Sequence, residues 1–296
     1  MYPISYIEPV FRPPSEWKSL IIQVTNGCSW NQCTFCEMYT SENKTFKPKK
    51  LELIEREIQL ASLSGMPVSR VFLADGDAMM LPFRQLKSIL KLIKQYLPKV
   101  NRISSYCLPR NLRNKTVEQL TELQELGLKL LYVGCESGDD ELLTLIKKGE
   151  TYQSSLEALN KVKQADMKSS VMILNGLGGK KYSQQHMINS AKLMNQTQPD
   201  YLSTLVVSFP MGEERFAKPF NGDFLPLTQE ELFQEMLILL ENLQLSKTIF
   251  RSDHASNYLV LKGILGQDKQ KLLAQVNQAL QSPQTTALRQ EWQRGL

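Results

Sequence analysis

Three cysteines lie within nine residues of one another, at Cys28, Cys33 and Cys36. The run Cys-Thr-Phe-Cys places two thiols two residues apart, a spacing that zinc sites and iron–sulfur sites both use. A structural zinc site normally takes four protein ligands, and the sequence has neither a second Cys-x-x-Cys pair nor a close pair of histidines. Three thiolates therefore leave one coordination position open, although the spacing alone does not choose the metal.

The elements that must position these thiols are strands and helices in alternation. Short apolar runs alternate with amphipathic segments, as in βα units around a parallel sheet. Six strands are predicted, at Leu20–Thr25, Val71–Ala74, Arg102–Tyr106, Leu130–Val133, Ser170–Leu174 and Tyr201–Phe209. Helices are predicted at Leu51–Leu63, Phe83–Leu97, Thr116–Leu126, Tyr152–Ala165, Gln184–Gln196, Thr228–Gln244, Lys269–Leu280 and Thr286–Arg294.

This order predicts an α/β fold, a partial (β/α)6 TIM-like barrel of parallel strands with a helical C-terminal extension. We expect an irregular N-terminal segment over residues 1–17, the barrel over 18–215, and the extension, packed on or capping the barrel, over 216–296. In such a fold the segment after each strand faces the ligand. Those segments are polar or cysteine-rich here: Asn26-Gly27-Cys28, Asp75-Gly76-Asp77, Cys107-Leu108-Pro109-Arg110, Gly134-Cys135-Glu136-Ser137-Gly138 and Asn175-Gly176-Leu177-Gly178-Gly179.

Composition narrows the class of protein. The net charge of +5 comes from 35 basic and 30 acidic residues spread along the 296-residue chain, so no dense basic stripe indicates a nucleic-acid partner, although none is excluded. No run approaches the roughly 18 apolar residues of a membrane helix, and the first residues lack the pattern of a signal peptide. Five cysteines, an odd number, suit a reducing compartment. We expect a cytoplasmic protein with no membrane partner.

The cysteine run resembles a known family. The segment from Val24 to Cys36 is similar to the cluster loop of the radical S-adenosylmethionine (SAM) superfamily, with the aromatic Phe35 directly before the last cysteine. It departs in having four residues between Cys28 and Cys33, where the family usually has three, so it is a variant C-x4-C-x2-C loop.

Further landmarks resemble the family in order over roughly residues 18–215. Ala74-Asp75-Gly76-Asp77 stands where the family has Gly-Gly-Glu-Pro. Two later runs are similar to the branch that includes methylthiotransferases, the Elongator catalytic subunit and oxygen-independent coproporphyrinogen oxidases; they are Tyr132–Gly138, followed by Lys148-Gly149, and Val171–Gly179.

The resemblance implies that Cys28, Cys33 and Cys36 hold a [4Fe-4S] cluster and that SAM binds its fourth iron. Reductive cleavage of SAM would give a 5′-deoxyadenosyl radical that abstracts hydrogen from a substrate, with flavodoxin or ferredoxin as the kind of reductant. The implied contacts to SAM are Asp75, Gly76 and Asp77 for the ammonium, Ser104 or Ser105 for the carboxylate, Glu136 for the ribose or amino group, Ile173 and Val207 for the adenine, and also Phe35 and Asn175.

A polar segment beyond the barrel, Phe250–Tyr258, is the candidate for substrate binding. It is either a hydrogen-bonded turn or a wall of the substrate cavity, and we favour the cavity. Arg251 would clamp a carboxylate or phosphate, and His254 would orient substrate or move a proton, with Asp253 and Tyr258 beside them. The other histidine, His186, is expected at the surface.

Three functions follow as hypotheses. The first is a radical SAM enzyme acting on a small organic metabolite. The second is a radical SAM enzyme that modifies RNA or protein, and the third is a non-catalytic iron–sulfur carrier or scaffold. Cys107 and Cys135 are expected to be buried packing residues, because a lone cysteine usually behaves as a small hydrophobe.

Overall fold

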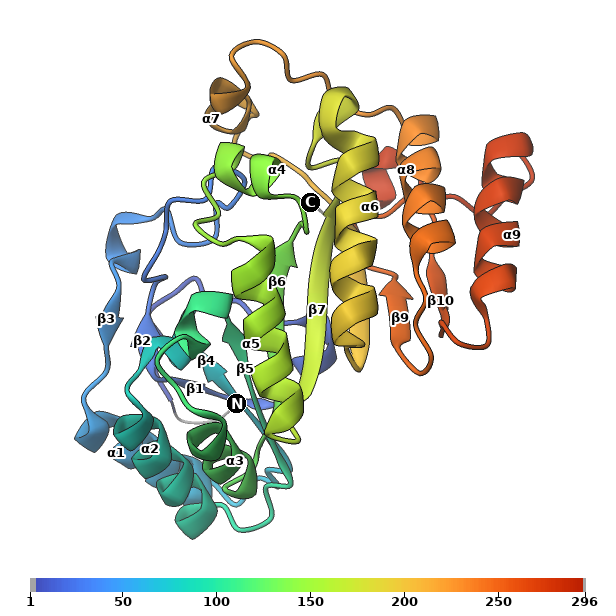
Figure 1. Cartoon of the computed structure of the whole chain (residues 1–296). Coiled ribbons are helices and arrows are strands. Elements are labelled where there is room, and N and C mark those ends of the chain that lie inside the picture. The colour runs from blue at the N-terminus through green and yellow to red at the C-terminus, as the bar shows by residue number, and fades with distance from the viewer. Residues whose placement is uncertain (1–3, 295–296) are drawn as a thin grey trace. The chain divides into compact units, whose positions relative to one another are not determined.

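A computed structural model describes residues 4–294, and the chain divides into two compact units (Figure 1). The first unit comprises the residues up to Asn31 together with Cys36–Val133 and Asn160–Ser169. The second comprises Gln32–Phe35, Gly134–Leu159 and the residues from Ser170 onward. Each unit is described by itself below.

The first unit contains parallel strands in the order β1, β4, β5, β6. Their bounds are β1 (Leu20–Gln23), β4 (Arg70–Ala74), β5 (Arg102–Cys107) and β6 (Leu128–Glu136), of which β6 continues into the second unit. Four of the five residues of β4 are fully buried, as expected of an inner strand of a parallel sheet. A short antiparallel pair, β2 (Thr25–Asn26) with β3 (Lys47–Pro48), carries the chain away from β1.

Three helices pack in sequence in this unit (Figure 1): α1 (Leu51–Leu63), α2 (Phe83–Tyr96) and α3 (Val117–Glu125). The start of α3 is fixed by a capping box. The hydroxyl of Thr116 accepts from the Gln119 N–H at 3.3 Å, and the Gln119 side chain accepts from the Thr116 N–H at 3.2 Å.

The second unit continues the strand order as β6, β7, β8, β9, β10. The new strands are β7 (Lys168–Asn175), β8 (Tyr201–Val206), β9 (Ile249–Ser252) and β10 (Leu261–Ile264). Strands β7, β8 and β9 are parallel, and β10 is antiparallel to β9. Because β1 and β10 are the two ends of the order, the sheet is open. The predicted α/β fold with a partial barrel of parallel strands is confirmed.

Helices of the second unit follow its strands. They are α4 (Asp140–Leu145), α5 (Tyr152–Gln164, whose last turns belong to the first unit), α6 (Gly179–Thr197), α7 (Glu214–Ala217), α8 (Gln229–Asn242) and α9 (Lys269–Gln281). Helices α6, α8 and α9 lie side by side in that order (Figure 1). Helix α6 begins five residues before the predicted Gln184, at Gly179.

The extension is not purely helical, because β9 and β10 form where no strand was predicted. The helix predicted at Thr286–Arg294 is wrong: only a short 3-10 turn forms, at Glu291–Gln293. Two arginines hold this stretch to the chain after β9, since Arg289 and Arg294 donate to backbone carbonyl groups there. The predicted domain boundaries at 17 and 215 stay a prediction.

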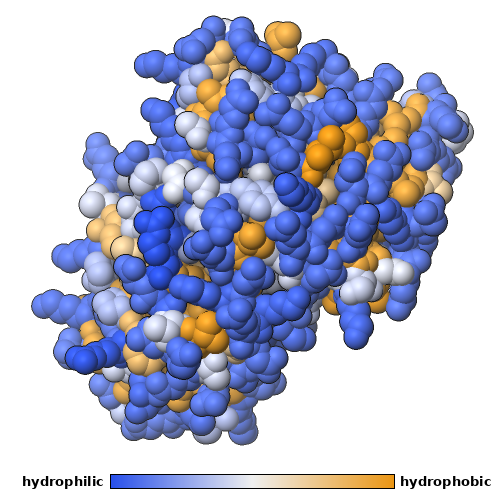
Figure 2. Space-filling view, viewed as in Figure 1, coloured by the Kyte–Doolittle hydropathy of each residue, from blue (hydrophilic) through white to orange (hydrophobic). Residues whose placement is uncertain are grey.

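The surface shown in Figure 2 is covered mainly by hydrophilic side chains. The large apolar side chains that are exposed, such as those of Trp17 and Trp292, lie far apart in the sequence. Within residues 4–294, none of the helices has both the length and the apolar character needed to cross a lipid bilayer.

Candidate functional site

The cysteine loop of the first unit begins at a position that only glycine fits. Gly27 has a φ of +67°, and a Cβ atom there would lie 2.0 Å from the carbonyl oxygen of Lys44. Cys28 follows directly, and Cys36 returns the chain to the same unit. Both thiols are partly exposed and neither forms a disulfide. The loop is therefore fixed at its entrance and carries two accessible thiols.

Side chains between these cysteines tie the loop to the ends of β4 and β5. The Ser29 hydroxyl donates to Asp77 after β4. The guanidinium of Arg110, after β5, lies 3.8 Å from the centre of the Trp30 ring, a cation–π geometry. Asn31 adopts a left-handed conformation with a φ of 43°, which asparagine tolerates. The loop thus lies at the carboxyl edge of the strands, as predicted.

Asp75 is fully occupied by partners within the protein. Its Oδ2 atom forms an ion pair with the Lys44 ammonium at 2.7 Å, with both side chains fully buried, and accepts from Gln23 at 3.2 Å. Its Oδ1 atom accepts from the Gly76 N–H at 2.8 Å. At Gly76 a Cβ atom would lie 2.5 Å from the Tyr39 ring, so the turn needs glycine. Asp75 and Gly76 therefore stabilise the turn after β4, and their contact with SAM stays a prediction.

Asp77 differs because one of its oxygens lacks a hydrogen bond. Oδ2 accepts from Ser29, whereas the buried Oδ1 has no hydrogen-bond partner among the described residues. Burial raises the pKa of the carboxyl, opposed by the hydrogen bond from Ser29, by the nearby Asn111 side chain and by the charge of Arg110. A buried acceptor without a partner is costly unless a ligand supplies the donor.

Ser104 and Ser105 lie inside β5, and both are fully buried. Their hydroxyls donate to the backbone of β4, at 3.5 Å to Val71 and 3.1 Å to Leu73. These bonds occupy the hydroxyl hydrogens. The predicted contact with the SAM carboxylate therefore stays a prediction, and the structure gives each serine a role in the sheet.

The middle of the cysteine loop belongs to the second unit. The Thr34 N–H donates to the Ile146 carbonyl at 3.0 Å, and Arg215 donates to the Cys33 carbonyl at 2.9 Å. Phe35 packs against a hydrophobic cluster that includes Ile146. Cys33 is buried and forms no disulfide. Two later segments of the chain thus hold the backbone at Cys33 and Thr34.

Near Cys33 lies a buried ion pair that sequence reasoning only half identified. The Lys148 ammonium contacts Glu136 at 2.9 Å, and the two side chains are 4% and 9% exposed. Burial alone lowers the pKa of Lys148, but Glu136 first and Cys33 second raise it on balance. At Gly134 a Cβ atom would lie 2.4 Å from the Glu136 carboxylate. In the sequence, Lys148 was noted only as part of the resemblance to the family. Its position shortly after Glu136 was the signal that could have predicted the ion pair.

His186 is fully buried, so the expectation that it lies at the surface is wrong. Its Nδ1 lies 2.7 Å from the Ser137 hydroxyl, and its Nε2 lies 2.9 Å from the Leu174 carbonyl. Because a carbonyl only accepts, Nε2 carries the hydrogen and Nδ1 accepts from serine. Burial lowers the pKa of His186 to about 4, which keeps the ring neutral. This histidine joins the ends of β6 and β7.

The end of β7 presents the remaining predicted SAM contacts. Asn175 and Ile173 share one face of the strand, and the Asn175 amide lies 3.4 Å from Glu235 of α8. Ile173 is fully buried, whereas Val207 is half-buried and donates its N–H to the Asn175 carbonyl at 2.9 Å. The side chains of Ile173 and Asn175 thus face α8, and contact with adenine stays a prediction for all three.

The predicted substrate segment forms a tight turn after β9. Arg251 is an exposed residue of β9, and Asp253 pairs with Lys262 of β10 at 2.8 Å. The His254 Nδ1 accepts from the Ser256 N–H at 3.1 Å. Burial is the main reason that the pKa of His254 is lowered. Much of the segment therefore forms a hydrogen-bonded turn, the less favoured of the two interpretations of its sequence.

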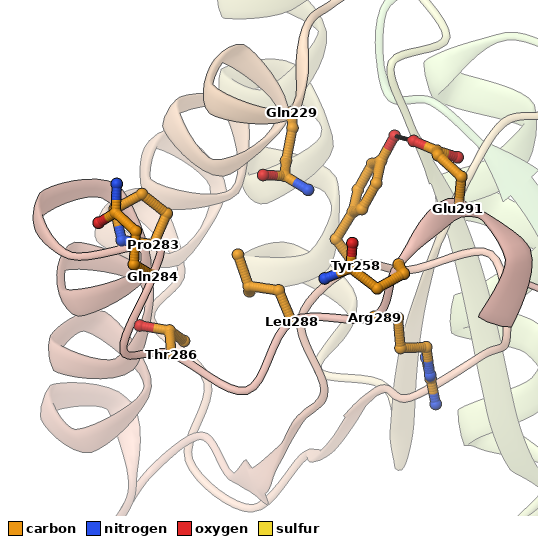
Figure 3. Close-up of a pocket in the computed structure, with 9 residues that line it drawn as sticks. Gln229, Tyr258, Pro283, Gln284, Thr286, Leu288, Arg289 and Glu291 are labelled. Atoms are coloured by element: carbon orange, nitrogen blue, oxygen red, sulfur yellow. Dashed lines mark hydrogen bonds between the residues drawn. The ribbon is translucent and has the colours of Figure 1, made fainter.

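Tyr258, at the end of this turn, lines a cavity of about 340 Å³ (Figure 3). Its hydroxyl donates to Glu291, and the two side chains point toward each other. The Arg289 guanidinium points away from that pair and donates to the His254 carbonyl at 2.6 Å. Of the segment Phe250–Tyr258, only Tyr258 lines this cavity, and the roles of Arg251, Asp253, His254 and Tyr258 in catalysis stay a prediction.

The donor chemistry fits an iron–sulfur cluster and SAM. Across residues 4–294, no three Cys, His, Asp or Glu side chains lie close enough together to hold a metal ion. The assignment of the three cysteines as cluster ligands therefore rests on their residue type and spacing. None of the five cysteines forms a disulfide. Three of them lie on one short loop, and the buried Oδ1 of Asp77 lacks a donor of the kind that an ammonium group supplies.

Known proteins resemble about half of this chain. The tRNA-2-methylthio-N(6)-dimethylallyladenosine synthase of Colwellia psychrerythraea is 26% identical over 172 residues, which cover 55% of this chain and 35% of that protein. The heme chaperone HemW of Bacillus subtilis is 25% identical over 169 residues, covering 53% and 45%. The chain thus spans less than half the length of either relative.

A solved structure shares the fold. The radical SAM methyltransferase TsrM of Kitasatospora setae, solved with cobalamin and a [4Fe-4S] cluster bound, superposes with a TM-score of 0.51 at 18% identity, covering 63% of this chain and 36% of that one. The sequence also matches the radical SAM superfamily over residues 22–194, more than half of its length. This chain therefore belongs to the radical SAM superfamily.

Proposed function

We propose that this chain is an enzyme that reductively cleaves SAM at a [4Fe-4S] cluster and uses the resulting radical to take hydrogen from a small organic substrate. Family membership supports the SAM chemistry. Cys28, Cys33 and Cys36 would hold the cluster, and a flavodoxin or ferredoxin would reduce it. The size of the cavity beside Tyr258, about 340 Å³, falls in the range of small-molecule sites.

The observation that carries the proposal is the buried Oδ1 atom of Asp77, which has no hydrogen-bond partner among the described residues. Asp77 directly follows the turn at the end of β4, where the resemblance places the methionine ammonium. Because that ammonium is a cation with three donors, it would complete the hydrogen bonding of Oδ1 and favour the ionised carboxyl. Ser29, which donates to Oδ2, would orient the group.

In the second unit, Glu136 and Lys148 would serve the other end of the ligand. Glu136 has a positive φ of 63°, which turns its side chain onto the Lys148 ammonium. The Glu136 carboxylate would accept a hydrogen bond from the ribose of SAM, one of the two contacts that the resemblance implies for it. Lys148 would fix the carboxylate of Glu136, and the cation would also balance negative charge at Cys33.

We expect Asp77→Asn to keep the cluster but to weaken SAM binding by roughly ten- to a hundredfold, because a charge-assisted hydrogen bond is lost. Equilibrium dialysis of labelled SAM with anaerobically reconstituted protein measures this. The matched control is Asp223→Asn, which removes an exposed carboxylate paired with Lys181. Equal SAM affinity in wild type and Asp77→Asn would assign Asp77 a purely structural role.

A second prediction concerns the turn after β9. We expect Arg251→Ala and His254→Ala to retain the cluster and SAM binding but to lose turnover of the true substrate, because both belong to the segment proposed to bind substrate and neither is among the residues proposed to hold the cluster or SAM. Each variant is tested in two assays, SAM binding and product formation. Normal product yield from both variants would remove this turn from the substrate site.

The relatives leave two other functions to be tested. One relative is named as a tRNA-modifying synthase and another as a heme chaperone. Formation of 5′-deoxyadenosine from SAM under reducing, anaerobic conditions distinguishes an enzyme from a carrier. Stimulation of that reaction by tRNA, and by no small-molecule fraction, would favour RNA modification.

A further inference from the structure

A buried carboxyl on α8 is bonded to the turn that follows β7. Glu235 is fully buried, and its Oε2 atom accepts from the Gly176 N–H at 2.6 Å. Its Oε1 atom lies 2.9 Å from the Ser183 hydroxyl of α6. The Asn175 amide is a weaker third contact, at 3.4 Å. One side chain therefore joins the end of β7, the turn after it and the helix that follows.

Among residues 4–294, no cationic side chain pairs with this carboxyl. Burial raises the pKa of Glu235 to about 8, while its contacts with Gly176, Ser183 and Asn175 lower it only in part. These groups come from the turn, α6 and β7, and all are uncharged. The neutral acid is thus favoured over most of the usual pH range, and it still offers Oε2 as an acceptor to Gly176.

The glycines of this turn have no side chains to fix its backbone, although Leu177 between them is fully buried in a hydrophobic cluster. Gly176 has a φ of +79°, and a Cβ atom there would lie 3.1 Å from Leu232, also on α8. The turn then passes through Gly178 and Gly179 into α6. Since glycine backbone is permissive, its conformation depends on neighbours, and α8 supplies two of them.

We propose that Glu235 is a positioning residue that fixes the backbone of the Asn175–Gly176 turn. Glu235 lies in the C-terminal part of the chain, outside residues 22–194 that match the family. This part of the chain therefore sets the backbone conformation at the ligand-facing end of β7. The inference rests on the proposed function for its statement that SAM lies at the carboxyl ends of the strands. It adds that SAM affinity depends on a residue of α8.

The test compares Glu235→Ala with Glu235→Gln, and the matched control is Glu241→Gln on the exposed side of the same helix. Glutamine keeps an oxygen acceptor for Gly176, whereas alanine removes it. We expect Glu235→Ala to speed hydrogen exchange at the Gly176 amide and to weaken SAM binding by the cluster-loaded protein about tenfold. Glu235→Gln and Glu241→Gln should match wild type in both measurements.

Stability against pH gives a readout that loss of packing would not produce. A folded-state pKa near 8, above the ordinary glutamate value of 4.5, means that the folded chain binds more protons than the unfolded chain between these values. Stability from this group is therefore full below about pH 4.5 and is lost as pH rises toward 8. The unfolding temperature of wild type should fall over this range relative to that of Glu235→Gln.

The outcomes separate the inference from the proposed function. If wild type binds SAM and Glu235→Ala binds it equally well, the inference is overturned and the proposed function stands. A Glu235→Gln variant as impaired as Glu235→Ala also overturns it, because the acceptor would then not be the cause. Failure of cluster-loaded wild type to bind SAM at all defeats both.

Discussion

Replacing Cys28, Cys33 or Cys36 by alanine is expected to abolish the cluster, whereas replacing Cys107 or Cys135 should leave it intact. Each of the three thiolates would hold a different iron, and three is the smallest number that fixes a cubane with one open position. Anaerobic reconstitution followed by iron and sulfide analysis measures the result, with about four of each per chain expected only in proteins that retain all three thiols.

The control cysteines are suited to the comparison. Cys135 is fully buried in β6, and burial raises the pKa of its thiol to about 12, so it stays protonated and is a poor metal ligand. Cys107 is also buried, at the end of β5. Circular dichroism of each apoprotein separates loss of a ligand from loss of the fold. Iron uptake by Cys33→Ala together with failure of Cys135→Ala would refute the assignment.

The fold could be predicted because short runs with strand character alternate with amphipathic helical segments at βα spacing. The six strands from β1 to β8 in the main sheet each overlap a predicted strand. Strands β9 and β10 have only four residues each, with Arg251 in one and Lys262 with Gly263 in the other. A segment so short and so polar shows no clear hydrophobic periodicity. Strand β9 forms because β8 offers it an unpaired edge, and this tertiary contact cannot be seen in the local sequence.

The candidate site could be predicted only where position after a strand indicated function. Asp77 and Glu136 were predicted in that way, and their contact with SAM stays a prediction. Lys148 lies only 12 residues after its partner Glu136, so this pair was within reach of the sequence. His186 and Glu235 were not given a site role, because their roles depend on partners far along the chain: Gly176 precedes Glu235 by 59 residues, and Ser137 precedes His186 by 49. A lone buried histidine or glutamate has no local signature. The same limit explains why Asp75 resembled a ligand contact, since its partner Lys44 lies 31 residues away.

The buried pair of Glu136 and Lys148 should produce the other large effect. Lys148→Met leaves a carboxylate that is only 9% exposed without its cation, and Glu136→Gln leaves a buried ammonium without its anion. Removal of one partner of a buried ion pair costs about 3–5 kcal/mol of folding free energy. Urea unfolding of each variant at neutral pH measures this cost, and SAM affinity should fall in both variants as well.

Two further variants show whether the cost comes from the unpaired charge. Lys180→Met breaks an exposed pair with Glu231, and should cost less than about 1 kcal/mol. The double variant Glu136→Gln with Lys148→Met leaves no charge buried, so it should be clearly more stable than the sum of the single losses predicts. Simple additivity would mean that the two residues do not act as a pair. Recovery of stability without recovery of SAM binding would show that the charges serve the ligand as well as the fold, which is the outcome we expect.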